Sequence, residues 1–440
     1  MALARRRQVL THDGAWLGAR MSGPPGPIRV LVLATKPPFP AVGGGNMTLD
    51  ALLRALPARD VEVRVLALAL RAGPERATAY AIRPVIVSWY RRFMGSLVCA
   101  RALPLPVARY HSPGFLPPLA DELRAFAPHV IHLEQPHLGW LLPEVGNRYP
   151  VVLRAQNVES RVLARLADVR AGFVSWLLRR EARRMARFEA EVCRQADVVA
   201  AISEVDARRL AELAPSARVV HLPAAWGRAL TSPNGNLAGE RPFLCLGTFD
   251  WSPNRDGARW LVRDVWPRLV RREPGATLHL AGPGSTHLGS TSDRRISCHG
   301  RVDDVGPLYD PRSVALIPLR AGSGVRLRLL EAWWAGVPAV VTPAAAEGLL
   351  DGDADGACVA GTAEEFSAMA VRLATDQPLR ERVVTAGRRR LLAHEAGRVA
   401  RLARDVYLEA IDRAAHRFRT QSHGAGDPSN GLRPRSTSRQ

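Results

Sequence analysis

A chain of 440 residues is long for one hydrophobic core, so we expect two domains. Hydrophobic residues make up 47% of it and charged residues 23%, which is typical of a soluble globular protein, and no stretch approaches the roughly 20 apolar residues of a membrane span. The five scattered cysteines show no metal-site spacing and fit a reducing cytoplasm. The net charge of +20 comes from arginine, because Lys36 is the only lysine. It indicates either a generic solvated surface or an anionic partner: lipid, nucleotide phosphates or nucleic acid.

The first part of the chain alternates short apolar runs with helical patterns. Residues 1–27 read as a loose extension. The run IRVLVLAT (28–35) predicts a buried parallel strand, and a glycine loop, a helix over 47–59 and a strand over 61–70 complete a βαβ unit of Rossmann type. Further strands are predicted at 129–134, 150–156, 197–203 and 218–224, and helices at 176–196 and 204–214. We expect a first domain over residues 28–230.

A Pro-, Gly- and Asn-rich stretch follows, and we interpret residues 231–240 as a linker. A second alternation of elements predicts another domain over 241–396. Its strands are predicted at 243–249, 276–284, 296–302, 314–319 and 338–343, and its helices at 254–273, behind residue 324 and at 366–376. One last long helix is predicted over 381–418, and its part 397–418 could pack back on the first domain.

Residues 419–440 are poor in apolar side chains and should be disordered. The predicted fold class is α/β, with two Rossmann-like, doubly wound domains that face a central cleft. Ligands of open α/β sheets bind at the carboxyl ends of the strands, so we expect the functional site in that cleft.

The stretch RAGSGVRLRLLEAWWAGVPAVVTP (320–343) shows a pattern that suits an anion at a helix start. The loop before the helix holds Gly322, Ser323 and Gly324. A helix start offers unpaired backbone N–H groups, and the guanidinium groups of Arg326 and Arg328 bind phosphate well. Arg328 and Glu331 share a helix face, whereas Arg326 lies well round from it. An ordinary surface helix with an Arg328–Glu331 ion pair explains the same residues.

Five stretches together resemble the retaining GT-B glycosyltransferases of group 1 and family 4, and within them the bacterial branch that makes exopolysaccharides. They are PPFPAVGGGNMTLDALLRAL, VIHLEQPHLGWLLP, RAQNVESRVLARLA, FLCLGTFDWSPNRDGARWLVRDVWPRL and HGRVDDVGPLYDPRSVALIPLRAGSGVRLRLLEAWWAGVPAVVTPAAAEGL. The resemblance spans about residues 28–390 and is most specific in the last two stretches. It implies a first domain that binds the acceptor and a second domain that binds a nucleotide-sugar donor.

The resemblance assigns roles within the 320–343 stretch. In the family, the glutamate that matches Glu331 holds the ribose hydroxyls of the donor nucleotide. Arg326 and Arg328 would then bind the donor diphosphate and act in catalysis. Ser323 stands where the wider family has a first motif glutamate, so its hydroxyl and backbone replace a carboxylate here.

Weaker matches add candidates on both sides of the cleft. The glycines Gly43, Gly44 and Gly45 would let the backbone approach the diphosphate, or they form a flexible turn. Asp250 and Asn254 would face the cleft or cap the next helix. The segment whose backbone usually contacts the nucleotide base matches Gly300, Arg301 and Val302.

The remaining candidates follow predicted strands of the first domain. In the wider family a histidine near His132 assists the donor sugar, which makes His132 a catalytic candidate with Glu134 beside it; a buried strand-end histidine is the alternative. Asn157 and Glu159 belong to a motif that normally begins with histidine, where this chain has Gln156. They would bind acceptor hydroxyls or cap the next helix.

The implied reaction moves a sugar from a nucleotide diphosphate sugar to an acceptor hydroxyl of a polysaccharide, glycolipid or lipid-linked glycan, with retention of anomeric configuration. Arg326, Arg328 and the helix start would stabilise the leaving diphosphate without a metal or another cofactor. The nearest Asp-x-Asp pattern, in residues 351–355, reads as a turn. In the family, a donor phosphate oxygen often helps to deprotonate the acceptor.

Other functions share parts of this pattern. A catalytically degenerate sugar-nucleotide binder would explain Ser323 and Gln156, and a sugar-nucleotide epimerase shares the fold but not these motifs. A phosphorylase that uses pyridoxal phosphate needs a lysine, which the second domain lacks. A nucleic-acid partner suits the charge, but the arginines are spread over both halves and no nucleic-acid-binding motif is present, so we expect none.

An anionic membrane surface explains the positive net charge better than a nucleic acid does. Two segments, 87–111 and 176–189, mix aromatic, leucine and arginine residues and could lie on anionic lipid, although a helix with a basic exposed face explains them equally. We expect a cytoplasmic protein that could associate peripherally with the inner membrane face.

Overall fold

The computed structural model describes residues 26–40, 44–71, 79–88, 99–168, 170–228, 234–288, 293–320, 325–350 and 354–424. Within them, the first domain holds a parallel sheet of seven strands in the order β3-β2-β1-β4-β5-β6-β7. These strands are β1 (Ile28–Ala34), β2 (Val61–Ala69), β3 (Ala81–Ile86), β4 (Val130–Glu134), β5 (Val151–Ala155), β6 (Val198–Ala201) and β7 (Val219–His221).

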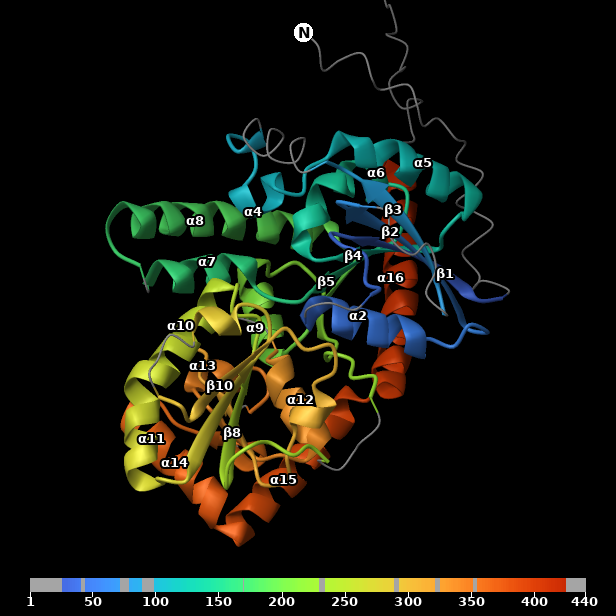
Figure 1. Cartoon of the computed structure of the whole chain (residues 1–440). Coiled ribbons are helices and arrows are strands. Elements are labelled where there is room, and N and C mark those ends of the chain that lie inside the picture. Colours follow the sequence, from blue (N-terminus) through green and yellow to red (C-terminus); the bar gives the residue numbers. More distant parts are fainter. Residues whose placement is uncertain are drawn as a thin grey trace, which may run out of the picture.

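Helices cover both faces of this sheet (Figure 1). One face packs against α2 (Gly44–Ala55) and α16 (Ala396–Gly424), and the other against α5 (Leu116–Ala125), α8 (Gly172–Gln195) and α9 (Glu204–Leu213). The shorter elements are α4 (Leu105–Ala108), α6 (Leu142–Val145), α7 (Glu159–Asp168) and the 3₁₀ turns η1 (Pro113–Phe115) and η2 (Pro136–Leu141). Because both faces are covered, the central strands are apolar at nearly every position.

The second domain repeats this design in a sheet that has six parallel strands within the described residues, in the order β10-β9-β8-β11-β12-β13. They are β8 (Arg241–Leu246), β9 (Ala276–Ala281), β10 (Ile296–Gly300), β11 (Val314–Ile317), β12 (Ala339–Val341) and β13 (Cys358–Val359). The α-helices are α10 (Ser252–Trp260), α11 (Trp266–Arg272), α12 (Leu327–Ala335), α13 (Pro343–Ala346), α14 (Ala363–Thr375) and α15 (Gln377–Leu391). The predicted α/β class with two doubly wound domains is confirmed.

The strand orders locate the expected ligand site. The winding direction reverses between β1 and β4 in the first sheet and between β8 and β11 in the second. Ligands of open parallel sheets bind beyond the carboxyl ends of the strands at such switch points.

The predicted last helix over 381–418 is wrong, because the chain breaks between α15 and α16. A 3₁₀ turn, η7 (Leu392–His394), separates them. The Trp226 N–H donates to the His394 carbonyl at 2.6 Å, and the Ala396 N–H donates to the Trp226 carbonyl at 3.1 Å. The chain passes from the first domain to the second after Trp226 and returns to the first domain at α16. These bonds link the two passages to each other.

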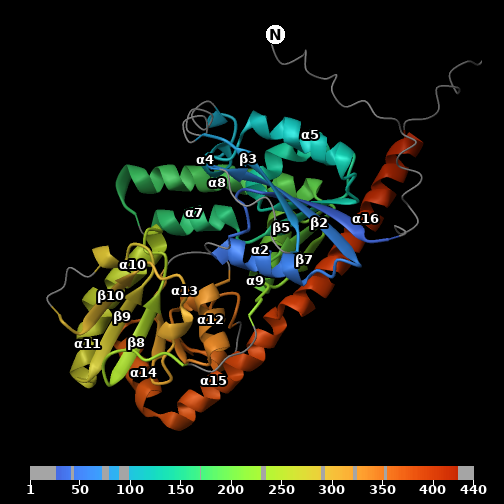
Figure 2. The ribbon, with the colours of Figure 1, turned by 45° about the vertical axis from the view of Figure 1, so that its right-hand side comes forward.

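After the break, α16 runs along the first domain (Figures 1 and 2). Its buried side chains, among them Val399, Ala403 and Tyr407, complete the core on one face of the first sheet. The helix continues to Gly424, so the disordered tail predicted from residue 419 starts too early, while residues 425–440 lie outside the described part.

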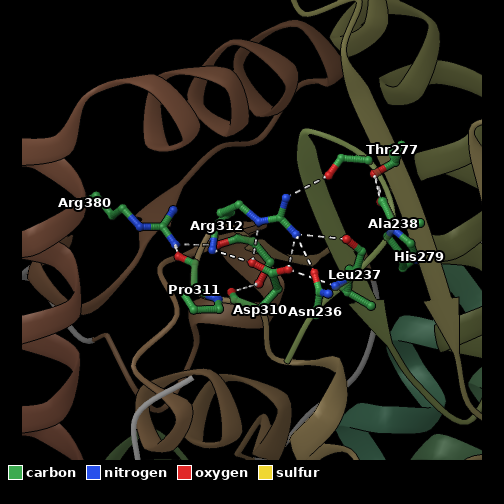
Figure 3. Close-up of polar contacts among 11 residues, drawn as sticks. Asn236, Leu237, Ala238, Thr277, His279, Asp310, Pro311, Arg312 and Arg380 are labelled. Carbon is green, nitrogen blue, oxygen red and sulfur yellow. Dashed lines mark hydrogen bonds and ion pairs between the residues drawn. The ribbon is translucent and has the colours of Figure 1, made fainter. Parts of the chain in front are cut away.

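The described part of the linker, residues 234–240, is fixed to the second domain (Figure 3). Asp310 accepts the Leu237 N–H at 2.8 Å, and Arg312 donates to the Leu237 carbonyl at 3.0 Å and to the Gly239 carbonyl at 3.1 Å. Thr277 donates to the Ala238 carbonyl at 2.8 Å. Residues 234–240 are therefore part of the second domain.

Candidate active site

Two cavities meet between the domains. The first-domain cavity has a volume of about 540 Å³, and the second-domain cavity about 340 Å³. Both are lined by Gly44, Trp251, Val325, Arg326 and Leu327, so they form one cleft. Other lining residues lie one or two positions after strands of the two sheets: Thr35, Gln135, Gln156, Ile202, Thr248 and Pro318. The cleft therefore lies at the carboxyl edges of both sheets, as predicted.

Arg328 and Glu331 line the second-domain cavity from α12. Arg328 donates a hydrogen bond to Glu331 Oε2, and the side chain of Glu331 is 1% exposed against 34% for Arg328. The ion pair that a surface helix would explain is thus present, but it lies in a cavity. A buried carboxylate that keeps one partner can still accept hydroxyl groups on its other oxygen.

Arg326 is the N-cap residue of α12 and lines both cavities. Burial, together with the positive charge of Arg165, lowers the pKa of Arg326 to about 10, although Glu347 and Asp206 oppose this. The guanidinium group therefore stays charged at neutral pH. It lies beside the positive end of a helix, and together they form an anion-binding arrangement.

Two glycines bring the first domain close to this helix. A Cβ atom on Gly44 would lie 2.9 Å from Leu327 Cδ1 of the second domain, and one on Gly45 would lie 2.1 Å from Gln156 Oε1. A larger residue at either position would displace the tip of that side chain, so glycine allows the close approach without a rearrangement. Gly44 begins α2, so the starts of α2 and α12 approach each other across the cleft.

The structure contradicts a cleft position for His132 and Glu134, because both side chains are buried below it. Residues at alternate positions of β4 share a face, and His132 points toward α16, where its Nδ1 lies 2.8 Å from the Tyr407 hydroxyl. His132 Nε2 lies 2.8 Å from Glu134 Oε2. Burial alone would raise the pKa of Glu134, but Arg154, His132 and Gln156 hold it below its ordinary value.

His132 and Glu134 instead support a residue at the cleft. Glu134 Oε1 accepts a hydrogen bond from Gln156, which also donates to the Gly45 carbonyl at 3.3 Å. Gln156 lines the first-domain cavity, whereas His132 and Glu134 line neither cavity. Their role is positioning rather than contact with a ligand.

His137 is the cleft histidine that the sequence reasoning missed. It lies in η2, lines the first-domain cavity and packs edge-on against Tyr110. Its Nε2 is 3.9 Å from Glu159 Oε2, and its buried Nδ1 has no hydrogen-bond partner in the described part of the chain. Burial lowers the pKa of His137, with Glu159 opposing and Arg109 assisting, so the ring is neutral at pH 7.

The first-domain cavity brings further residues together. Asn157 and Glu159 line it as predicted, and Asn157 donates to Glu159 Oε1 at 3.2 Å. The cavity is also lined by Lys36, Arg109, Tyr110 and Gln135, which the sequence did not single out. The sequence could have indicated Lys36 and Gln135, because both directly follow predicted strands.

Only some of the candidate residues of the second domain line the cleft. Asn254 lines the second-domain cavity and donates to the Thr248 carbonyl at 3.1 Å, whereas Asp250 is exposed and lines neither cavity. No side chain caps α10, whose N-cap residue is Trp251. The segment Gly300–Val302 also lies away from both cavities, so its predicted contact with a ligand is unsupported.

Several predicted positions lie outside the described residues, namely Gly43, Gly322, Ser323, Gly324 and residues 351–353 of the Asp-x-Asp turn. Among the residues that are described, no group of three His, Cys, Asp or Glu side chains is arranged to hold a metal ion. No helix in that part is long and apolar enough to cross a membrane.

Both domains match models of known protein families. Residues 42–224 match the model described as Glycosyltransferase Family 4, and residues 240–376 match the one described as Glycosyl transferases group 1. The chain belongs to the group 1 and family 4 glycosyltransferases. A search of curated proteins finds no match.

Solved structures share the fold of this glycosyltransferase at low sequence identity. Sucrose-phosphate synthase from Thermosynechococcus elongatus has a TM-score of 0.61 at 16% identity, over 90% of this chain and 100% of that one. Anabaena HepE in complex with UDP and glucose has a TM-score of 0.58 at 13% identity, over 86% of this chain and 99% of that one. A trehalose-phosphate synthase from Burkholderia xenovorans in complex with glucose-6-phosphate has a TM-score of 0.59 at 15% identity, over 87% of this chain and 100% of that one. The glycosyltransferase therefore has the GT-B architecture of two facing Rossmann-like domains.

Proposed function

We propose that this glycosyltransferase moves a sugar from a nucleotide diphosphate sugar to an acceptor hydroxyl of a glycan or glycolipid, with retention of configuration and without a metal. The observation that carries the proposal is the grouping of Arg326, Arg328 and Glu331 at the start of α12, in the cavity where the two sheets face each other. This grouping offers two cations, a helix start and one buried carboxylate to a single ligand.

The second-domain cavity would hold the donor. Glu331 would accept the ribose hydroxyls, and Arg326 and Arg328 would bind the diphosphate. Negative charge builds on the diphosphate as the sugar leaves, so cations that are already fixed in place lower the barrier. Arg326 lies between both cavities, next to the point where the sugar would be transferred.

The first-domain cavity would hold the acceptor. Asn157 and Glu159 offer an amide and a carboxylate to sugar hydroxyls, and the neutral ring of His137 offers a further hydrogen bond. A phosphate oxygen of the donor would take the proton of the acceptor hydroxyl. This step and the retention of configuration are supported by the family resemblance.

The test is a thermal-shift and turnover screen with nucleotide diphosphates and nucleotide sugars, beginning with UDP because HepE was solved with it. We expect one nucleotide to stabilise the protein and its sugar conjugate to be slowly hydrolysed. Glu331→Gln should weaken nucleotide binding by roughly tenfold to a hundredfold, because a charged hydrogen bond contributes about 1.5–3 kcal/mol. Arg326→Gln should lower turnover by about a hundredfold.

Arg301→Gln is the matched control, because Arg301 is exposed and lines neither cavity. An equal loss in this variant would mean that net charge, not the α12 site, governs binding. Binding without turnover, with glycan and lipid-linked acceptors supplied, would identify a degenerate nucleotide-sugar binder. NMR of the product anomer decides between retention and inversion.

A further inference from the structure

One face of α8 has no packing role. The residues Phe173, Trp176, Arg180, Arg183 and Arg187, called the α8 stripe below, follow one another at helical spacing and are all exposed. Phe173 is 73% exposed and Trp176 56%, and their rings stack at 5.5 Å between centroids. The inward face of α8 buries Ala182, Met185 and Val192 instead. The fold is thus satisfied without the α8 stripe.

Two further apolar side chains are exposed on or next to α8, outside the stripe itself. Val174 is 52% exposed, and Leu105 of α4 is 43% exposed. The Leu105 N–H donates to Glu181 at 2.8 Å, so α4 lies against α8, and Figure 1 shows the two helices side by side. Aromatic and aliphatic groups that remain in water forgo the free energy of burial, which indicates a partner with an apolar phase.

The arginines of the α8 stripe also have no partners in the described part of the fold. Arg180, Arg183 and Arg187 form no ion pair or hydrogen bond with any residue in the described ranges. Their neighbours on α8 differ: Arg179 pairs with Asp168 at 3.1 Å, Arg184 with Glu181 at 2.7 Å and Arg194 with Glu191 at 2.6 Å. Three aligned arginines without carboxylates match an anionic surface.

We propose that the α8 stripe docks the protein on an anionic lipid bilayer. Trp and Phe side chains settle at the level of the lipid headgroups, and arginine stems lie along apolar surface while their charges reach phosphate. The two aromatic rings stack on each other at one end of the stripe, which favours a bilayer over a nucleic acid, whose bases stack on aromatic rings in a basic groove.

The docking surface is connected to the cleft. The start of α7, with Glu159 in the first-domain cavity, is held by Glu189 of α8, which accepts the Glu159 N–H at 2.6 Å and the Ser160 N–H at 3.0 Å. Arg170, between α7 and α8, donates to Ser252 at 2.8 Å, next to the cleft residue Trp251. Helix α8 thus carries the docking surface on its exposed face and positions the start of α7 in the acceptor cavity through its buried face, and the inference of a lipid-linked acceptor rests on the proposed function.

The test is flotation of the full chain with vesicles of phosphatidylcholine alone and of phosphatidylcholine with one quarter phosphatidylglycerol. We expect binding to the anionic vesicles that weakens with salt. Arg180→Gln, Arg183→Gln and Arg187→Gln together should reduce partitioning at least tenfold, since each arginine near an anionic surface contributes about fivefold. Phe173→Ala with Trp176→Ala should also reduce it about tenfold.

The matched control changes Arg259, Arg263 and Arg271 to glutamine, because these exposed arginines lie on α10, η3 (Leu261–Val265) and α11 of the second domain, and none is in an ion pair among the described residues. Full binding in the control with loss in both stripe variants supports the proposal. Equal loss in the control, no binding to anionic vesicles, or complete displacement by duplex RNA would overturn it. Nucleotide-induced thermal shifts verify that each variant is folded, and vesicle binding does not depend on turnover.

Discussion

At the scale of single residues, two histidines that lie five positions apart in the sequence differ in whether they line the cleft. His132 belongs to β4 and is enclosed by the sheet and α16, whereas His137 lies beyond the end of the strand and lines the cavity. Gln135, with a φ of 78°, turns the chain between them. Position relative to the strand end, rather than residue type, decides which histidine can contact a ligand.

The two histidines should respond differently to substitution. His137→Gln should lower turnover at least tenfold with a small change in stability, because its buried ring faces the cavity. His132→Ala should lower the free energy of unfolding by about 2–3 kcal/mol, because it removes the buried partner of the Tyr407 hydroxyl and one of the partners of Glu134. Thermal unfolding and turnover of the same preparations check both. A stable but inactive His132→Ala protein would restore the role that the sequence suggested.

At the scale of elements, the turn between α15 and α16 contains a buried histidine. His394 Nδ1 lies 2.9 Å from the Ala224 carbonyl, and burial lowers the pKa of His394 to about 4. The unfolded side chain takes up a proton near pH 6.5. Between these values the unfolded state binds more protons, so stability falls as the pH falls through this window.

His394→Gln should remove this dependence. The stability advantage of the wild type over the variant should shrink by about 2 kcal/mol between pH 7 and pH 5. Urea unfolding at both pH values measures the difference, with His287→Gln at an exposed site as the control. An advantage that stays constant over this range would show that His394 does not titrate at the turn.

The elements also show what the sequence could and could not reveal. Strands β1, β4 and β8 were predicted within two or three residues, because buried parallel strands are continuous apolar runs. Strand β3 was missed because its edge position gives the mixed run AIRPVI. The α15–α16 break was missed because a helical pattern continues through it, whereas contacts with Ala224 and Trp226, far away in the sequence, hold the turn. Likewise, Tyr407, the partner of His132 Nδ1, lies in α16, far away in the sequence.

At the scale of the whole molecule, one carboxylate joins the domains. Glu347, after α13, contacts Arg161 at 3.2 Å, Arg209 at 2.7 Å and Arg165, all from the first domain. Arg326 lies close enough to sense both Arg165 and Glu347. Glu347 therefore holds three arginines of the first domain close to Arg326 of the second, with Asp206 as a further negative charge near Arg326.

Glu347→Gln should open the cleft, because the arginines of the first domain would then repel Arg326 of the second. We expect a larger radius of gyration in small-angle X-ray scattering and roughly tenfold weaker binding of the donor nucleotide. Glu364→Gln removes a carboxylate that pairs only within the second domain, with Arg268 and Arg272, and serves as the control. Identical scattering profiles for wild type and Glu347→Gln would exclude this role.

The return of α16 to the first domain has a consequence for the order of folding during synthesis. Domains usually fold from the amino terminus as they leave the ribosome. Here the first sheet lacks the cover of Val399, Ala403 and Tyr407 until the end of the chain has emerged. The second domain, complete by Leu391, can close before that. The domain that is synthesised first is therefore the one that finishes folding last, and it needs protection from aggregation in the meantime.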